Sequence, residues 1–157
     1  MKGKHREMNY IGQHDISDCG PACLAMISNY YGLKYPLQRF RELTRTGKNG
    51  TSLQGIIDGA QNLGFDAEAL SGTYDELIEA IQSHEVKLPC IAHYTKGHFV
   101  IISKIKKNSL VIMNPESGKH KISVEKFIDL WSGYIITIYP GTNFKKESCS
   151  ISTLKKN

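Results

Sequence analysis

The sequence predicts an α+β fold, with a helical N-terminal half packed on a C-terminal antiparallel sheet. Up to Ser83 the chain is rich in helix-capping residues followed by apolar residues three or four positions apart. From Pro89 onward it is dominated by short β-branched, apolar stretches. Helices grouped first and strands grouped second are typical of α+β proteins rather than of alternating βαβ units.

The first predicted helix begins at Cys19. Asp18 is expected to cap it, Pro21 is tolerated in a first helical turn, and Gly32 ends it. At a helix N-terminus the helix dipole and the unpaired N–H groups favour thiolate over thiol. This segment alone fits a buried structural cysteine equally well, because most free cysteines pack as small apolar residues.

The other elements follow from caps, periodicity and turn residues. Thr51 or Ser52 is expected to cap one helix, and Thr73 with Glu76 forms a capping box for another. We expect helices over 36–43, 52–64, 73–83 and 123–131, and strands over 65–70, 89–94, 98–105, 109–114 and 133–139.

Length and composition indicate one globular domain. The 157 residues are 40% hydrophobic and 22% charged, which is ordinary for a soluble protein with a real core. No apolar run approaches the roughly 18 residues of a membrane span, and the first residues lack a signal-peptide core. We therefore expect a cytoplasmic protein, with a domain over residues 1–140 and a disordered tail or linker over residues 141–157.

The basic charge does not indicate nucleic-acid binding. The net charge is +5 and the pI is about 9.0. Aromatic residues do not interleave with the basic ones, as they do on single-strand-binding surfaces. The lysines lie in stretches that we expect to be hairpin tips and chain ends, namely Lys104–Lys107, Lys119–Lys121 and Lys145–Lys156.

The cysteines are expected to be reduced, with Cys23 and Cys90 in the core. Their spacing does not match a disulfide framework or a zinc ribbon. A mixed metal site from Cys19, Cys23, His14 and His98 is conceivable on a weak spacing signal, but we predict neither a metal nor a cofactor.

A predicted hairpin brings a histidine close to an amide. Lys106–Asn108 separates two strand-like stretches, so that a three-residue loop makes Ile105 face Ser109. In this register His98 and Asn114 lie on one face of the hairpin, as near neighbours at its open end. A change of register by one residue would put the two side chains on opposite faces.

Together these residues supply the groups needed for nucleophilic catalysis. Cys19 provides a thiolate, His98 an acid or base, and Asn114 a group that orients the imidazole. Gln13 offers a side-chain N–H to an oxyanion, beside the backbone N–H of Cys19. Taken singly, Gln13 fits a surface amide, His98 an ordinary strand histidine, and Asn114-Pro115 a turn.

The sequence resembles the C39 peptidase family, the papain-like cysteine protease domains of bacteriocin-exporting ABC transporters. The resemblance covers about residues 8–140 and is carried by Gln13-x-x-x-x-Asp18-Cys19-Gly20-Pro21-Ala22-Cys23, Gly97-His98-Phe99-Val100 and Asn114-Pro115. It implies a papain-like fold with Cys19 as nucleophile, His98 as general acid/base and Gln13 as oxyanion donor. The third position of the triad is most often aspartate in this family, so Asn114 predicts an active but slower enzyme.

The resemblance also implies a substrate and partners. It implies a cysteine endopeptidase that removes the leader of a bacteriocin, lantibiotic or peptide-pheromone precursor after Gly-Gly or Gly-Ala, coupled to export. The leader would dock as an amphipathic helix in a shallow groove. In a longer protein, the domain would adjoin the transmembrane and ATP-binding domains of a transporter at the cytosolic face of the membrane. A leader-binding module that does not cleave, or another thiol enzyme such as an acyltransferase or amidase, are the alternatives.

Overall fold

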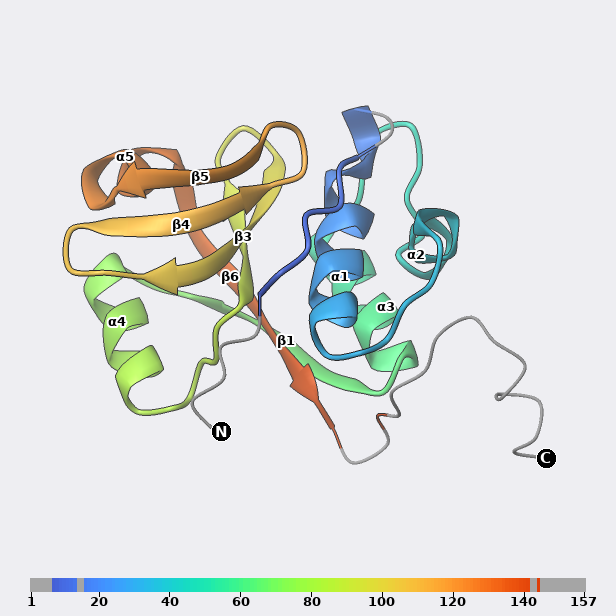
Figure 1. The fold of residues 1–157 in the computed structure, drawn as a ribbon, viewed down its shortest axis with the longest axis horizontal. Coiled ribbons are helices and arrows are strands. Elements are labelled where there is room, and N and C mark those ends of the chain that lie inside the picture. The colour runs from blue at the N-terminus through green and yellow to red at the C-terminus, as the bar shows by residue number, and fades with distance from the viewer. Residues whose placement is uncertain (1–6, 14–15, 142–143, 145–157) are drawn as a thin grey trace.

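The computed structural model describes residues 7–13, 16–141 and 144. Within these residues the chain forms one short 3-10 helix, five α-helices and six strands (Figure 1). In chain order they are η1 (Ile16–Asp18), α1 (Cys19–Tyr30), α2 (Leu37–Leu43), α3 (Leu53–Asn62), β1 (Phe65–Ser71), α4 (Tyr74–Gln82), β2 (Cys90–Tyr94), β3 (His98–Ile105), β4 (Ser109–Asn114), β5 (Gly118–Ser123), α5 (Val124–Leu130) and β6 (Trp131–Pro140). This is the α+β arrangement expected from the sequence.

The strands of the described residues form one sheet in the order β1-β6-β2-β3-β4-β5. All neighbouring strands in this sheet are antiparallel. The last strand, β6, lies between β1 and β2, where Ile136 pairs with both Ala69 and Ile91. β6 therefore joins the β1 edge to the β2–β5 part of the sheet.

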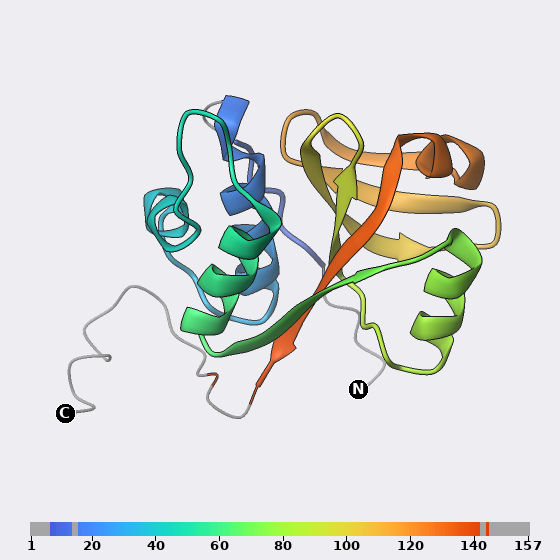
Figure 2. The ribbon, with the colours of Figure 1, turned by 180° about the vertical axis from the view of Figure 1, so that it is seen from behind.

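Side chains on the two faces of the sheet enter two separate cores. Along β3, Ile101 packs with α1, α2 and α3, whereas Ile102 packs with α4 and α5, because successive strand residues point to opposite faces. Figures 1 and 2 show α1, α2 and α3 grouped together and α4 and α5 set apart from them. Phe40 of α2 and Phe127 of α5 are almost fully buried, one in each core.

Three of the helix starts have the side-chain caps that stabilise an exposed first turn. Ser52 Oγ accepts a hydrogen bond from the Gly55 N–H at 2.9 Å. The predicted capping box of α4 is present, with bonds of 2.8 and 3.1 Å between Thr73 and Glu76. A similar bond from the Lys126 N–H to Ser123 Oγ begins α5.

The prediction that Asp18 caps α1 was wrong. Its backbone (φ −93°, ψ 8°) is not in the extended region that a capping residue normally adopts, because the turn of η1 leads directly into α1. Within the described residues, its side chain makes no capping bond. The buried carboxylate instead forms an ion pair with Arg41 of α2, with Nε 3.0 Å from Oδ1.

The predicted register of the β3–β4 hairpin holds at the site end but not at the turn. Ile105 pairs with Leu110 rather than with Ser109, and the Lys106 N–H donates to the Ser109 carbonyl. A bulge between Ile102 and Lys104 then shifts the register by one residue. Beyond it Ile101 pairs with Met113, which is the register predicted for the end that carries His98 and Asn114.

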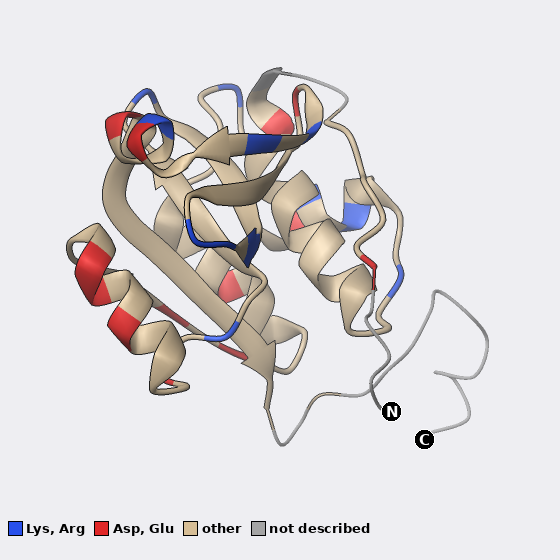
Figure 3. Cartoon of the chain, turned by 60° about the vertical axis from the view of Figure 1, so that its left-hand side comes forward, with Lys and Arg blue, Asp and Glu red and all other residues tan. Residues whose placement is uncertain are grey.

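Strand β5 was missed, and the expectation that Lys119–Lys121 form a hairpin tip was wrong. These lysines lie on β5, where Lys119 pairs with Met113 and Lys121 with Val111. Figure 3 shows both the basic and the acidic residues distributed over several elements, with acidic residues on α4 and α5 among them. Because β5 is a polar strand at the edge of the sheet, it also resists pairing with other chains.

Candidate active site

Cys19 is the first residue of α1 and is 6% exposed. The following residue has no room for a side chain, since a Cβ on Gly20 would lie 2.7 Å from the Cβ of Thr51. Thr51 is held in turn by a hydrogen bond between its hydroxyl and that of Thr46. The loop before α3 is thus packed directly against the backbone that carries the Cys19 thiol.

His98 begins β3 and lies between the thiol and an amide. It follows Gly97, whose φ of +86° is a conformation that favours glycine. Its imidazole forms side-chain hydrogen bonds with Cys19 and with Asn114. His98 on β3 thus interacts with Cys19 at the start of α1 and with Asn114 at the end of β4.

The orientation of the Asn114 amide is fixed by a backbone donor. The Glu116 N–H donates to Asn114 Oδ1 at 2.9 Å, and only the amide oxygen can accept this bond. The same oxygen lies 2.8 Å from His98 Nε2, so Nε2 must carry a proton and donate it. Nδ1 is then the ring nitrogen left to bond with Cys19.

The surroundings of His98 favour its protonated form. Burial alone lowers the pKa of this histidine, because it penalises the charged ring. Hydrogen bonds to Cys19 and Asn114, together with negative charge on Cys19 and Glu116, outweigh burial and raise the pKa above its ordinary value. The ring is thus suited to hold a proton taken from a neighbouring thiol.

Gln13 lies beside the turn that follows Asn114. Its backbone N–H donates to the Pro115 carbonyl at 3.0 Å, and the Tyr10 hydroxyl donates to the same oxygen at 2.6 Å. These bonds tie the N-terminal segment to the end of β4. They bring the half-buried Gln13 to the same part of the molecule as His98 and Asn114.

Comparison with known proteins fits this geometry. Residues 7–143 match the sequence model of the peptidase C39 family. The chain belongs to the peptidase C39 family. It is accordingly a cysteine peptidase with the papain-like α+β fold that its sequence predicted.

Curated relatives of this C39 peptidase are much longer proteins. The lactococcin-G-processing and transport ATP-binding protein LagD of Lactococcus lactis subsp. lactis is 36% identical over 139 residues, which are 86% of this chain and 19% of LagD. The colicin V secretion/processing ATP-binding protein CvaB of Escherichia coli is 34% identical over 143 residues, which are 91% of this chain and 20% of CvaB. The chain thus spans about a fifth of the length of these relatives.

Solved structures agree over most of the fold. The peptidase domain of Streptococcus ComA, a bi-functional ABC transporter involved in a quorum-sensing pathway, has a TM-score of 0.76 and 30% identity, over 87% of this chain and 99% of that one. A double glycine motif protease from an AMS/PCAT transporter, in complex with the leader peptide, has a TM-score of 0.79 and 27% identity, over 88% of this chain and 96% of that one. Among the described residues of our chain, no helix is both long enough and apolar enough to cross a membrane.

The remaining cysteines of the described C39 domain are core residues, as predicted. Cys23 and Cys90 are fully buried, and burial raises the pKa of Cys90 to about 12. Burial, reinforced by the proximity of Cys19, also raises the pKa of Cys23 well above its ordinary value. Both thiols therefore stay protonated and are poor nucleophiles at neutral pH.

The mixed metal site considered from the sequence, made of Cys19, Cys23, His14 and His98, does not form within the described part of the chain. No group of three or more metal-ligating side chains comes together there. His14, one of its four members, lies outside the described residues.

Sequence reasoning missed two charged residues near the site. Arg41 reaches Asp18 from a different helix, so no local pattern indicates the pair. Glu116 could have been found, because Asn-Pro-Glu after a strand is typical of a turn in which the asparagine accepts a bond from the residue two positions on.

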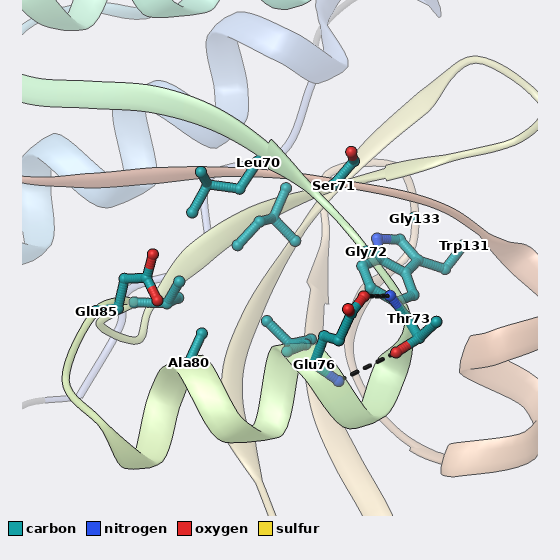
Figure 4. Close-up of a pocket in the computed structure, with 12 residues that line it drawn as sticks. Leu70, Ser71, Gly72, Thr73, Glu76, Ala80, Glu85, Trp131 and Gly133 are labelled. Carbon is teal, nitrogen blue, oxygen red and sulfur yellow. Dashed lines mark hydrogen bonds between the residues drawn. The ribbon is translucent and has the colours of Figure 1, made fainter.

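A separate pocket of about 230 Å³ lies between α4, β1 and the start of β6 (Figure 4). Its lining includes Leu70, Ala80 and Trp131, together with the carboxylates of Glu76 and Glu85. None of the four predicted site residues lines it. The pocket is therefore distinct from the Cys19–His98 pair.

Proposed function

We propose that this chain is a thiol endopeptidase that removes leader peptides after Gly-Gly or Gly-Ala, with Cys19, His98 and Asn114 as its catalytic residues. The observation that carries the proposal is the position of His98, whose Nε2 lies 2.8 Å from Asn114 Oδ1 and whose pKa is raised by hydrogen bonding and charge from the Cys19 side chain. The order of roles matches a nucleophile, an acid/base and an orienting group. Membership of the C39 family supports the same assignment.

The reaction begins with a proton transfer. The Cys19 thiol gives its proton to His98 Nδ1, which forms a thiolate beside an imidazolium. The thiolate attacks the carbonyl carbon of the second glycine, and His98 returns the proton to the leaving amine as the C–N bond breaks. Water then attacks the thioester, gives one proton to Nδ1, and releases the leader as a carboxylic acid with the thiol restored.

Two donors are available for the oxyanion of the tetrahedral intermediate. The backbone N–H of Cys19, at the start of α1, is the first proposed donor. The side-chain amide of Gln13 is the second proposed donor, supported by the bond from its backbone to Pro115 beside the site.

The proposed substrate is a precursor peptide with an amphipathic helical leader. One structural neighbour is described as a double glycine motif protease in complex with the leader peptide, which supports this class of substrate. A narrow cleft that admits two glycines and rejects larger side chains gives specificity by exclusion. The leader helix adds apolar contacts at a distance from the cut.

We further propose that the chain works as one domain of an export machine. The curated relatives are transport and processing ATP-binding proteins, about five times longer than the part that matches. In such a protein the peptidase would adjoin transmembrane and ATP-binding domains on the cytosolic face of the membrane. The cargo would be a bacteriocin, a lantibiotic or a signalling peptide.

The test is cleavage of a synthetic double-glycine precursor, followed by mass spectrometry. We expect one cut, directly after the second glycine, and no cut by the Cys19→Ala variant. Cys23→Ala is the matched control, because it removes a buried thiol from the same helix and should leave cleavage intact. Binding of the precursor without cleavage by the unmodified protein would instead indicate a leader-binding module.

A further inference from the structure

The residues on either side of the proposed nucleophile, Cys19, are both held by α2 and the loop that follows it. On the N-terminal side, the Asp18 carboxylate is fully buried and pairs with Arg41 of α2, whose Nε lies 3.0 Å from Oδ1. The Arg41 side chain is partly buried, and its Nε is fully so. Because a buried charge is costly unless it is paired, this ion pair holds Asp18 against α2.

On the C-terminal side, a chain of three threonine hydroxyls connects the end of α2 to Gly20. Thr44 Oγ1 donates to the Phe40 carbonyl at 2.8 Å, so its single proton is used. It must then accept from Thr46, 2.7 Å away, and Thr46 in turn bonds to Thr51. Thr51 lies over Gly20, where a Cβ would come within 2.7 Å of the Thr51 Cβ. Gly20 is thus packed against a loop that is itself tied to α2.

The peptide bond between Asp18 and Cys19 carries the N–H that is the first proposed oxyanion donor. The peptide is planar, so the direction of this N–H is set by the backbone on its two sides, including ψ of Asp18 at 8°. An oxyanion donor is most effective when its direction is fixed before the reaction. A misplacement of about 1 Å can cost about 10²-fold in rate. Contacts that hold Asp18 in place therefore bear on the rate of the chemical step.

We propose that Arg41 is a positioning residue of the peptidase, which holds Asp18 so that the Cys19 N–H points at the oxyanion. The inference rests on the proposed function, because the oxyanion forms only when a peptide is cleaved. Arg41 acts through Asp18, from a neighbouring helix. A residue needed for stability alone would lower the melting temperature without a selective loss of kcat.

The test compares cleavage of a double-glycine precursor by Arg41→Gln, Arg41→Lys and Arg45→Gln. Arg41→Gln should lower kcat by about 10-fold with little change in KM, because the donor is made less rigid rather than removed. Arg41→Lys keeps the charge but moves it into a compact ammonium, and should lower kcat by about threefold. Arg45→Gln is the matched control, since it breaks an exposed ion pair with Asp58, of 2.8 Å, and should cleave at the full rate.

Stability is separated from positioning by measuring every rate below the melting temperature. Arg41→Gln leaves the buried Asp18 carboxylate without its counter-ion and should melt at a lower temperature. If this variant does not fold, Arg41→Lys decides the question. A kcat for Arg41→Lys equal to that of Arg45→Gln would overturn the inference.

Alkylation of Cys19 by iodoacetamide provides the contrast to cleavage. The thiolate displaces iodide from a saturated carbon, so no oxyanion forms and the N–H donor is not needed. The alkylation rate of Arg41→Lys should therefore match that of the unmodified protein, while its kcat is lower. A parallel fall in both rates would place the effect of Arg41 on the thiolate and overturn the inference.

NMR relaxation of the Cys19 backbone amide needs no substrate. Its order parameter should be about 0.85 in the unmodified protein and in Arg45→Gln, and lower by about 0.1 in Arg41→Lys. An equal order parameter in all three would overturn the role of Arg41. A protein that cleaves nothing would contradict the proposed function, while this measurement would still show whether Arg41 holds the Cys19 N–H.

Discussion

At the scale of single residues, the site depends on one amide whose orientation is fixed by a backbone donor. Because the Glu116 N–H bonds to Asn114 Oδ1, His98 must present Nε2–H to Asn114 and Nδ1 to Cys19. Asparagine is sufficient for this orientation. What it lacks is charge, and charge is therefore what a substitution at this position changes.

Asn114→Asp should make a faster enzyme with a shifted pH profile. A carboxylate would still accept both hydrogen bonds, while its charge would raise the pKa of His98 by about 1 unit. The measurement is kcat/KM from pH 5 to 10 with a double-glycine precursor. An unchanged rate and profile would show that Asn114 serves as well as aspartate.

The pH response of His98 follows from the direction of its pKa shift. Cys19→Ala removes the thiol's hydrogen bond and charge, so the pKa of His98 should fall, as NMR titration can measure. A raised pKa in the folded state means that His98 stabilises the fold fully below about pH 6.5. This contribution is lost as the pH rises through the raised value. A pKa that stays constant in Cys19→Ala would contradict the hydrogen bond to the thiol.

Gln13→Ala tests the second oxyanion donor. Loss of one such donor typically lowers kcat by about 10²- to 10³-fold, with little change in KM. Gln82→Ala, which truncates an exposed glutamine at the end of α4, is the matched control and should retain full activity. A kcat for Gln13→Ala within twofold of the control would remove Gln13 from the proposed mechanism.

At the scale of elements, short-range signals predicted the structure wherever a few neighbouring residues determine it. Capping residues located α3 and α4, and short β-branched, apolar stretches located β3 and β4. Strand β5 was missed because Gly-Lys-His-Lys-Ile-Ser has no apolar face, and it pairs only because β4 offers an open edge. The bulge near Ser103, which shifts the register between Ile102 and Lys104, was not predicted either.

The difference between local sequence signals and contacts across space also explains which residues of the site could be predicted. Cys19, His98 and Asn114 each lie at the end of an element, where local patterns are strongest. Arg41 and Glu116 act across space, the first on Asp18 and the second on His98. The ion pair of Arg41 needs the tertiary structure, since no spacing in the sequence encodes it, whereas the Asn-Pro-Glu turn that carries Glu116 has a local signal.

Helix α4 offers a test of capping without involvement of the site. Thr73→Ala removes the hydroxyl that accepts from the Glu76 N–H and should lower the free energy of unfolding by about 1 kcal/mol. Thr73→Ser keeps the hydroxyl and should be nearly neutral. Urea denaturation measures both, and cleavage should be unaffected in both. Equal stability of the two variants would show that the capping box contributes nothing.

At the scale of the whole molecule, the site and the C-terminal end of the domain lie at opposite ends of β6. Trp131, at its start, pairs with Tyr94 next to the β2–β3 turn that precedes His98, whereas Pro140 at its end pairs with Phe65. Beyond β6, Phe144 packs against Phe65, with ring centroids 4.5 Å apart and the ring planes tilted by 36°. The predicted domain boundary at residue 140 therefore falls before an aromatic contact with the core.

A comparison of two shortened chains locates the boundary. A chain ending at Phe144 should melt at the same temperature as the full chain, because it keeps the Phe65 contact and the bond from the Gly141 N–H to the Gly64 carbonyl. A chain ending at Pro140 loses both and should melt about 3 to 6 °C lower. Both should cleave precursor at the full rate below their melting temperatures, since the lost contacts are at the far end of β6. Equal melting temperatures for the two would place the boundary at residue 140, whereas a loss of cleavage would show that the two ends of the sheet are coupled.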